Sequence, residues 1–490
     1  MEGQDLKILF VAAEAVPYAK VGGLADVAGA LPKALARMGH DVRVVLPRYS
    51  SIDEARFKLS ASRDALGVTY RGQRTRAGLR EASGADGVPV YFIESPPQFH
   101  RPTIYSQPDD LDRFAFFALC ALEVPQAIGW QPDVVHAHDW HSALVAARAR
   151  VTRAGPRPAT VLTIHNVQYQ GNFGPEWLGQ AVPDAAALGM DRVLASGGNH
   201  SVMALGVAHA DAVNTVSETY AREILTPAYG YGMERLLQSL GERLCGIING
   251  IDYQELDPAT DPSLPVHYSA DRSAPRAKDK AALQRRVGLP EKAEVPVLGM
   301  VTRLADQKGL DILARALPRV LDEMDVQFVL LGTGQPEYHK LMREVADRHK
   351  DKAVFVEGFD PALAQLIYGG CDIFLMPSRF EPCGLGQLIA LRYGAIPLTR
   401  RTGGLADTVQ DCGDTLDKGN GFVFERYDAE ELVGCIRRAA RAYAKKDAWR
   451  QLMTKGMRLD FSWDASARKY VDLYRRAMGW AAGGRGGGAK

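Results

Sequence analysis

Apolar, β-rich runs alternate with amphipathic helical patterns along almost the whole chain. The first run, at 6–15, is followed by a glycine loop, a helical pattern over 24–39 and a second apolar run at 41–47. A helix between two such runs forms a βαβ unit, whose parallel strands are buried on both faces. Further strands of this sheet are expected at 88–95, 132–139, 160–166 and 211–217. The pattern therefore predicts an α/β fold built around a parallel sheet.

A second series of apolar runs follows a polar, Pro-rich and charged stretch at 257–279. Its strands are expected at 294–304, 326–334, 353–359, 372–378 and 395–401. A chain of 490 residues is long enough for two large domains. We therefore expect two doubly wound α/β domains in tandem, the first over 1–248 and the second over 249–460.

Charge and cysteine content narrow the classes of partner and compartment. The net charge is +1, so no overall field favours nucleic acid or an acidic membrane. The six cysteines form no CxxC pair, which indicates neither a disulfide framework nor a zinc knuckle and favours a reduced, cytoplasmic setting. No apolar run approaches the roughly 18 residues that a membrane span needs. The Gly-rich end of the chain is expected to be disordered.

The same glycine turn occurs near both ends of the chain, as KVGGLADV at 20–27 and TGGLADTV at 402–409. Each copy lies between an expected strand and an expected helix, where open α/β sheets bind their ligands. Two glycines let the backbone approach a ligand closely, and exposed helix N–H groups favour an anion. The alternative is that both copies are tight turns that bind nothing.

Charged residues follow two expected strands of the second domain. Arg303 and Lys308 leave the first of these strands, where a guanidinium fork and an ammonium suit a diphosphate. Glu381 follows the strand at 372–378, in the loop SRFEPCGLGQL. Cys383 in that loop can be interpreted as a nucleophile or, more simply, as a small thiol that packs. Gly384 opens the next helix and offers N–H groups to an anion.

The sequence HAHDWH at 136–141 is compatible with two kinds of site. Its histidines and aspartate resemble metal ligands, but the sequence offers no second ligand cluster. The alternative is a sugar cleft in which Asp139, Trp140 and His141 meet hydroxyl groups and a sugar face. His165 ends the next expected strand, with the aromatic Tyr169 beyond it. No P-loop, GxSxG elbow or complete GxGxxG fingerprint is present, which argues against P-loop kinases, ordinary α/β-hydrolases and nicotinamide dehydrogenases.

Taken in order, these motifs resemble those of the bacterial glycogen synthases and plant starch synthases that use ADP-glucose. The resemblance extends over nearly the whole chain and includes TVSETYAREI (215–224), YGMERLL (231–237) and INGID (248–252). It implies two facing Rossmann-like domains with an interdomain cleft, the GT-B glycosyltransferase fold. It also implies a final helix over 461–480 that returns to the first domain, which leaves a Gly-rich tail at 481–490.

On the donor side, the resemblance assigns roles to residues of both domains. Lys20 lies beside the donor, and Gly22 and Gly23 bring backbone against its diphosphate. Arg303 and Lys308 hold the donor phosphates.

On the sugar side, the resemblance places His165 beside the transferred glucose. Glu381 and Cys383 lie next to the sugar, while Gly384 and Leu385 offer backbone N–H groups. Further cleft residues are Asp26, Asp139 and Asn249.

The reaction implied is transfer of glucose from ADP-glucose to the non-reducing 4-hydroxyl of an α-1,4-glucan, with retention of configuration. No metal and no cofactor are expected, because fixed cations can stabilise the leaving ADP. Glu381 is expected to orient the sugar and support its oxocarbenium character. The catalytic residues implied are Glu381, His165, Lys308, Arg303 and Lys20.

Three positions depart from the common family pattern, and three different functions stay open. Val21 and Gly386 stand where many relatives have threonine, and Ala204 stands where many have lysine. A transferase with UDP-glucose as donor stays open, although Ile389 occupies the position of the second glutamate of sucrose-synthase-like enzymes. The second open function is a phosphorylase with pyridoxal phosphate, and the third is a non-catalytic glucan-binding protein.

Overall fold

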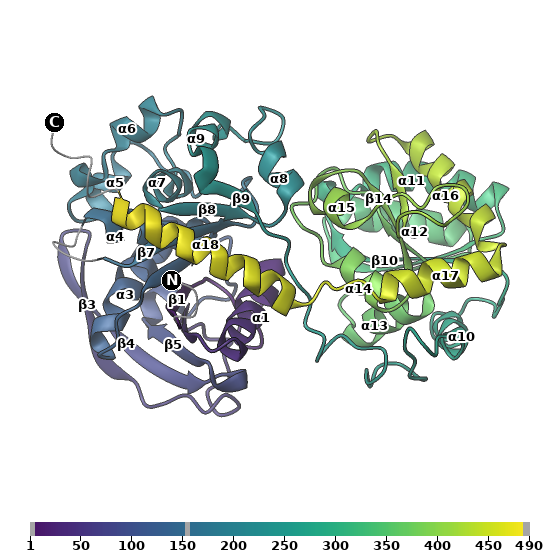
Figure 1. Cartoon of the computed structure of the whole chain (residues 1–490), viewed down its shortest axis with the longest axis horizontal. Coiled ribbons are helices and arrows are strands. Elements are labelled where there is room, and N and C mark those ends of the chain that lie inside the picture. Colours follow the sequence, from purple (N-terminus) through teal and green to yellow (C-terminus); the bar gives the residue numbers. More distant parts are fainter. Residues whose placement is uncertain (1–4, 152–156, 484–490) are drawn as a thin grey trace. The chain divides into compact units, whose positions relative to one another are not determined.

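The computed structural model describes residues 5–151 and 157–483, which form two compact units (Figure 1). Unit 1 comprises the chain up to Gly250 together with the residues from Trp463 onward. Unit 2 runs from Ile251 to Ser462. Each unit has its own hydrophobic core.

Unit 1 is built on one mixed sheet. Within the described residues this sheet has nine strands, in the order β3-β4-β5-β2-β1-β6-β7-β8-β9. The strands are β1 (Lys7–Val11), β2 (Asp41–Pro47), β3 (Arg63–Tyr70), β4 (Gln73–Ser83), β5 (Pro89–Glu94), β6 (Val134–His138), β7 (Ala159–Ile164), β8 (Ala212–Thr215) and β9 (Leu244–Gly246). The central strand β1 reads KILFV, and its residues from Ile8 to Val11 are fully buried, as expected for a strand covered on both faces.

The edge of the unit 1 sheet differs from the expected parallel pattern. Strands β3 and β4 form an antiparallel hairpin, and β4 also pairs antiparallel with β5. The turn between β3 and β4 uses Arg71 and Gly72, both with positive φ, which suits a tight hairpin. The sheet is therefore mixed, with a partly exposed antiparallel edge.

The helices of unit 1 include the last helix of the chain. They are α1 (Gly23–Arg37), α2 (Pro96–Phe99), α3 (Asp110–Ala127), α4 (Asp139–Val151), α5 (Trp177–Ala181), α6 (Met190–Ala195), α7 (Val202–His209), α8 (Glu218–Glu223), α9 (Glu234–Gln238) and α18 (Trp463–Gly483). Helix α18 crosses β7 and β8 beside α1 (Figure 1). Trp463, Tyr470 and Tyr474 of α18 are buried in the unit 1 core. The final residues of the chain's described part thus complete the first unit.

Unit 2 contains a wholly parallel sheet. Within the described residues it has six strands, in the order β12-β11-β10-β13-β14-β15. The strands are β10 (Val297–Leu304), β11 (Gln327–Gly334), β12 (Ala353–Glu357), β13 (Ile373–Met376), β14 (Ile396–Arg400) and β15 (Phe422–Phe424). The helices are α10 (Arg276–Arg286), α11 (Leu310–Glu323), α12 (Pro336–Arg348), α13 (Pro361–Gly370), α14 (Gly386–Arg392), α15 (Gly403–Thr408), α16 (Ala429–Tyr443) and α17 (Lys446–Met457).

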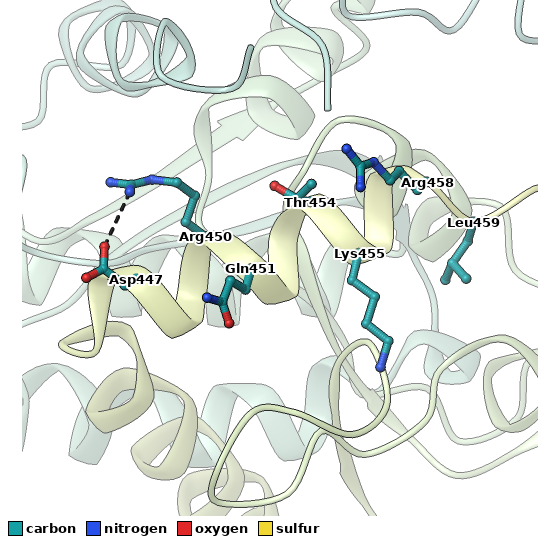
Figure 2. A pocket seen from close by; sticks show the side chains of 7 residues that line it. All are labelled: Asp447, Arg450, Gln451, Thr454, Lys455, Arg458 and Leu459. Atoms are coloured by element: carbon teal, nitrogen blue, oxygen red, sulfur yellow. Dashed lines mark hydrogen bonds and ion pairs between the residues drawn. The ribbon is translucent and has the colours of Figure 1, made fainter. Parts of the chain in front are cut away.

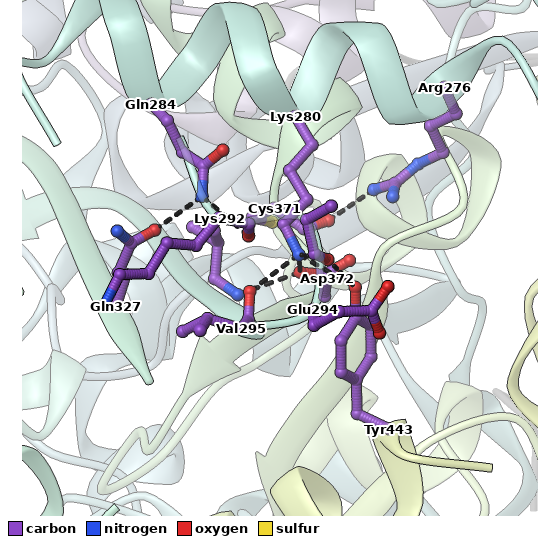
Figure 3. Close-up of polar contacts among 12 residues, drawn as sticks. Arg276, Lys280, Gln284, Lys292, Glu294, Val295, Gln327, Cys371, Asp372 and Tyr443 are labelled. Atoms are coloured by element: carbon purple, nitrogen blue, oxygen red, sulfur yellow. Dashed lines mark hydrogen bonds and ion pairs between the residues drawn. The ribbon is translucent and has the colours of Figure 1, made fainter. Parts of the chain in front are cut away.

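A buried cluster of hydrogen bonds and an ion pair links α10 to the amino ends of the unit 2 strands (Figure 3). The Nζ of Lys280 lies 2.7 Å from Oδ2 of Asp372, which immediately precedes β13. The same ammonium group donates to the carbonyl oxygen of Val295 and to the hydroxyl of Tyr443. A buried charge is stable only when it is paired and hydrogen-bonded in this way. The cluster thus stabilises the sheet at the edge opposite the carboxyl ends of its strands.

The end of the chain differs from the sequence prediction. The final helix, expected over 461–480, runs from Trp463 to Gly483, so residues 481–483 are helical instead of part of a tail. The remaining tail residues, 484–490, lie outside the described residues.

No helix among the described residues is both long enough and apolar enough to cross a membrane.

Candidate functional site

In unit 1, the loop that follows β1 is held by a buried carboxylate. Glu14 is 3% exposed, and its Oε2 accepts from the backbone N–H groups of Val21 and Gly22, the latter at 3.1 Å. Burial raises the pKa of Glu14 to about 7, although both N–H bonds lower it. Lys20, at the start of this loop, is exposed and pairs with Asp26, at 2.6 Å between Nζ and Oδ1. Glu14 was not predicted as a site residue, although an acidic residue inside an apolar run is a detectable signal.

Space is open beside the glycines of this loop. Helix α1 begins at Gly23, and a Cβ atom added there would meet nothing within 4 Å. A Cβ added at Gly22 would come within 3.5 Å of Oε1 of Glu14, an ordinary contact. The backbone of Gly23 is therefore accessible to a ligand.

Asp139 and His165 meet at the carboxyl ends of β6 and β7. Asp139 has a φ of 55°, a left-handed conformation that is uncommon for a residue with a side chain. Its Oδ1 accepts from the backbone N–H of His165 at 2.7 Å, and burial raises its pKa to about 7. Nε2 of His165 lies 3.1 Å from Nδ1 of His138, and burial lowers the pKa of His165 to about 3. His165 is therefore a neutral imidazole in a fixed position.

Trp140 is not a sugar-stacking surface, so that prediction was wrong. The residue is 9% exposed, and a Cβ added to Gly171 would lie 2.3 Å from its indole ring. Phe114 packs edge-on against the same ring. His141 also packs into this aromatic group, against Phe114 and Tyr105. An amphipathic indole suits a core as well as a sugar face, and the sequence could not separate the two.

The other expected cleft residues of unit 1 differ in exposure. Tyr169 is 55% exposed and remains a candidate for contact with sugar. Asn249 is 5% exposed, and its Oδ1 is buried without a hydrogen-bond partner among the described residues. An unpartnered buried amide oxygen is unusual and is compatible with a ligand that donates to it.

In unit 2, Lys308 and Glu381 form a largely buried ion pair at the carboxyl edge of the sheet. The distance between Nζ and Oε2 is 2.7 Å, and the hydroxyl of Ser378 donates to the same oxygen at 3.0 Å. Glu381 is 5% exposed. Arg303 lies at the end of β10 and is exposed, and its guanidinium makes no hydrogen bond or ion pair with the described residues. The structure thus places all three residues at one edge of the sheet.

The second glycine turn supports the loop that carries Glu381. The N–H of Gly404 donates to the carbonyl oxygen of Glu381 at 3.0 Å. A Cβ added at Gly404 would lie 2.2 Å from the carbonyl oxygen of Cys383, and one at Gly403 would lie 2.0 Å from that of Glu381. Gly403 also has a φ of +45°. Only glycine allows the two loops to approach so closely.

The rest of the SRFEPCGLGQL loop is compact. Cys383 is 5% exposed, in agreement with a packed thiol. Gly384 has a φ of +75°, and Leu385 precedes α14, which begins at Gly386. A Cβ at Gly386 would approach the ring of Phe374 to 3.0 Å, so a larger side chain here would require that ring to move.

The other two departures from the family pattern are explained by their surroundings. Ala204 is fully buried in α7, so it contacts core side chains, where a lysine would bring an unpaired charge. Val21 is 47% exposed, and only its backbone N–H is engaged by Glu14.

Beside Arg303 lies a hollow that was not predicted from the sequence. It measures about 570 Å³ and is lined by residues at the end of β11, along α12 and at the end of β12, including Thr333, Gly334 and Glu357. Thr333 is the register partner of Arg303. Phe359, two residues beyond β12, is 84% exposed, which is unusual for a large apolar ring. An aromatic residue after a glycine at a strand end was the signal that could have been recognised.

A second hollow in unit 2 lies away from this edge (Figure 2). It measures about 720 Å³ and is lined only by α17 and the residues that follow it. Arg450 pairs with Asp447, and Arg458 pairs with Asp271, so local carboxylates balance much of its charge. Figure 2 shows these side chains spread along one helix, without groups that converge on a point.

The histidines of HAHDWH do not form a metal centre in the part of the chain that the structure describes. His136 and His138 are fully buried, and three of their four ring nitrogens lie within hydrogen-bond distance of other side chains. No group of three or more His, Cys, Asp or Glu residues in the ranges 5–151 and 157–483 could hold a metal ion.

Both units are similar to families of known proteins. Residues 7–239 match the family model described as the starch synthase catalytic domain, and residues 283–453 match glycosyl transferases group 1. The chain is 45% identical over 482 residues to a glycogen synthase of Moorella thermoacetica, with 97% of each chain covered. It is 43% identical over 479 residues to a glycogen synthase of Bacillus subtilis, covering 96% of this chain and 98% of the relative.

Solved structures agree with these similarities. The catalytic domain of starch synthase IV from Arabidopsis thaliana, bound to ADP and acarbose, matches with a TM-score of 0.90 and 35% identity. That match covers 97% of this chain and 100% of the other. A sucrose-phosphate synthase from Thermosynechococcus elongatus matches over 97% of this chain and 99% of its own, with a TM-score of 0.62 at 20% identity, a likeness that shows the fold alone.

Proposed function

Because this chain belongs to the glycogen and starch synthase family of GT-B glycosyltransferases, we propose that it transfers glucose from ADP-glucose to the non-reducing 4-hydroxyl of an α-1,4-glucan, with retention of configuration. The observation that carries the proposal is the buried Lys308–Glu381 pair beside the unengaged Arg303. Together they offer a carboxylate for the sugar and two cations for a diphosphate at one edge of a parallel sheet. Such edges are where α/β sheets bind ligands.

The leaving diphosphate requires fixed positive charge. When the bond between C1 of glucose and the phosphate oxygen breaks, negative charge develops on ADP and positive character on the sugar. We assign Arg303, Lys308 and Lys20 to the diphosphate, because preorganised charge is usually the largest catalytic contribution. Backbone N–H groups of Gly384 and Leu385, and the accessible backbone at Gly22 and Gly23, would add to it.

Lys20 must exchange partners to fill this role. In the structure it pairs with Asp26, and both side chains are substantially exposed. An exposed ion pair contributes about 0–1 kcal/mol, so a diphosphate can replace the carboxylate with little loss. Asp26 would then be free to accept from a hydroxyl of a substrate.

The sugar would be oriented by Glu381 and His165. The acceptor 4-hydroxyl attacks C1 from the face that ADP leaves, and its proton passes to a donor phosphate oxygen. Glu381 supports the oxocarbenium character of the sugar. Cys383 lies next to the sugar. Tyr169, Asn249 and Asp139 are proposed contacts or supports on the glucan side.

Unit 2 has a surface that suits the nucleoside of the donor. We assign it to the hollow of about 570 Å³ beside Arg303, with the exposed ring of Phe359 as a stacking surface for the base. A flat aromatic ring accepts any base, so this contact alone does not select ADP over UDP. UDP-glucose therefore remains the second candidate donor.

The test is release of ADP from ADP-glucose with and without a glycogen primer, with UDP-glucose as the competing donor. We expect release that depends on the primer and favours ADP-glucose. Glu381→Gln is expected to lower kcat by about 100-fold or more, the scale of losing one transition-state contact. Glu425→Gln, at an exposed pair with Arg401, is the matched control and should retain kcat.

Two outcomes would contradict the proposal. One is ADP release that does not respond to primer, and the other is a Glu381→Gln variant with the full kcat. An absorbance scan for pyridoxal phosphate separates the phosphorylase alternative. A cytoplasmic location is also proposed, since the six cysteines, all of which lie within the described residues, form no disulfide.

A further inference from the structure

Three histidine rings form a continuous row in unit 1, and the proposed function uses only the last of them. The ring centroids of His136 and His138 lie 4.1 Å apart, and those of His138 and His165 lie 5.3 Å apart. His136 and His138 are fully buried, whereas His165 reaches the carboxyl edge of β7. Burial lowers the pKa of all three rings. Each ring is therefore neutral and has one N–H donor and one acceptor nitrogen.

The proton of His136 can be placed from its neighbours. The amide nitrogen of Asn214 donates to the backbone carbonyl of Thr215, so its Oδ1 is the end that faces Thr163. The hydroxyl of Thr163 donates to that Oδ1 at 2.7 Å and must accept from Nε2 of His136 at 2.6 Å. Nδ1 of His136 then accepts from the hydroxyl of Tyr474 in α18 at 2.9 Å. Both nitrogens of His136 are satisfied without His138.

His138 has one partner for two nitrogens. Its Nδ1 lies 3.1 Å from Nε2 of His165, and its Nε2 is buried without a partner among the described residues. If the proton were on Nε2, the core would contain an N–H group without an acceptor, which is rare in folded proteins. The proton is better placed on Nδ1 of His138, which donates to Nε2 of His165. Nε2 of His165 is then the acceptor, and its own proton is on Nδ1.

We propose that His138 is a positioning residue that fixes His165 in its Nδ1–H form, so that His165 presents a hydrogen-bond donor to a hydroxyl of the transferred sugar. Nδ1 of His165 makes no hydrogen bond within the described residues and is not sealed from solvent. The carboxylate of Asp139 holds the backbone N–H of the same residue, so both the position and the tautomer are set. The sugar as ligand rests on the proposed function, whereas the tautomer does not.

The first measurement needs no variant. In protein with ¹⁵N-labelled histidine, the ring nitrogens of His165 are expected to show the Nδ1–H pattern in the absence of substrate. A His165→Asn spectrum identifies the signals. An Nε2–H pattern for His165 in the unaltered protein would overturn the proposal. Because no turnover is involved, this result stands or fails independently of the glucosyltransferase activity.

Two substitutions at His138 separate positioning from packing. His138→Asn keeps an N–H donor near the place of Nδ1, whereas His138→Leu fills the space without one. We expect His138→Leu to lower kcat by about 10- to 100-fold, as a misplaced contact does, and to shift His165 toward the Nε2–H form. His138→Asn is expected to retain the Nδ1–H pattern and most of kcat, although it leaves more empty volume.

The test compares kcat and the His165 nitrogen spectrum in the two variants. Equal losses in both variants with an unchanged His165 spectrum would mean that His138 only packs, and the proposal would be wrong. Melting temperatures are measured alongside, so that a folding defect in either variant is recognised. If the unaltered protein shows the Nδ1–H pattern but no primer-dependent turnover, the proposed function fails while the tautomer assignment holds.

Discussion

The turn at Gly22–Gly23 in unit 1 has open space beside it, whereas the turn at Gly403–Gly404 in unit 2 is filled by the backbone of the Glu381 loop. Both turns continue with Leu-Ala-Asp and begin a helix. In the first, the absence of a side chain leaves room for a ligand. In the second, it lets two protein loops touch. One short motif therefore meets two different physical requirements, access in one unit and close packing in the other.

The ion-paired lysines of the two units also differ, in how far their side chains are exposed to solvent. Lys20 and Asp26 have side chains that are 51% and 32% exposed. Lys308 and Glu381 have side chains that are 18% and 6% exposed. Solvent weakens the first pair, while burial makes the second sensitive to loss of either partner. Unit 1 thus offers an adaptable cation and unit 2 a fixed one.

The largest expected effect separates the two turns directly. Gly404→Ala places a Cβ against the carbonyl oxygen of Cys383, and it should lower the free energy of unfolding of unit 2 by about 4 kcal/mol and abolish turnover. Gly23→Ala meets no atom and should change stability by about 0.5 kcal/mol or less, while raising KM for ADP-glucose. Denaturation curves and initial rates test both. Similar losses of stability in the two variants would break the comparison.

The next effect concerns the two lysines. Lys308→Met leaves the buried Glu381 without its cation and should lower the free energy of unfolding by about 3 kcal/mol. Lys20→Met breaks only an exposed pair, and the expected change is about 0–1 kcal/mol. Both variants should lose activity. In the double variant Lys308→Met with Glu381→Gln, part of the stability should return, and failure to recover would show that the pair is not the cause.

The smallest effect is the pH response of Glu14. Its folded pKa, about 7, lies above the ordinary value of 4.5, so the folded state binds this proton more tightly than the unfolded state. Stability from this group is therefore complete below about pH 4.5 and is lost as the pH rises toward about 7. Glu14→Gln should remove about 2–3 kcal/mol of this pH dependence, seen in denaturation midpoints from pH 5 to 8.

A control is needed for the pH experiment because Asp139 titrates in the same range. Its pKa is also raised to about 7, so a residual slope should persist in Glu14→Gln. A slope identical to that of the unaltered protein would show that Glu14 does not titrate in this window. In that case the loop after β1 would not be held by a carboxylate that gains and loses a proton. It would then no longer differ in this respect from the Glu381 loop of unit 2, which is held by backbone packing.

Much of the architecture could be predicted from the alternation of apolar runs and helical patterns, because buried parallel strands leave a strong signal. The hairpin β3–β4 was missed because its exposed faces are rich in charge, which hides the alternation of Leu66, Val68 and Tyr70. The strand expected at 6–15 ends at Val11, since the chain beyond it turns so that Glu14 can reach the glycine loop.

The candidate site was predictable where a charged residue lies at the end of a strand, as Arg303 does, or in the loop after one, as Glu381 does. Trp140 was assigned wrongly because the sequence does not show that Gly171 covers its ring. Phe359 was overlooked because the aromatic residue after Gly358 is visible in the sequence, but its exposure is a property of the fold. The row of histidines was visible as a motif, but its protons depend on Thr163, Asn214 and Tyr474, which lie far away in sequence.

Helix α18 has a consequence for how the protein is made. The chain is synthesised from its amino end, so all of unit 2 leaves the ribosome before Trp463, Tyr470 and Tyr474 do. Until then unit 1 lacks part of its interior, and His136 lacks the tyrosine hydroxyl to which its Nδ1 bonds. The amino-terminal half of a newly made molecule therefore matures last, and a message truncated just before codon 463 yields a protein with a finished second half and an unfinished first.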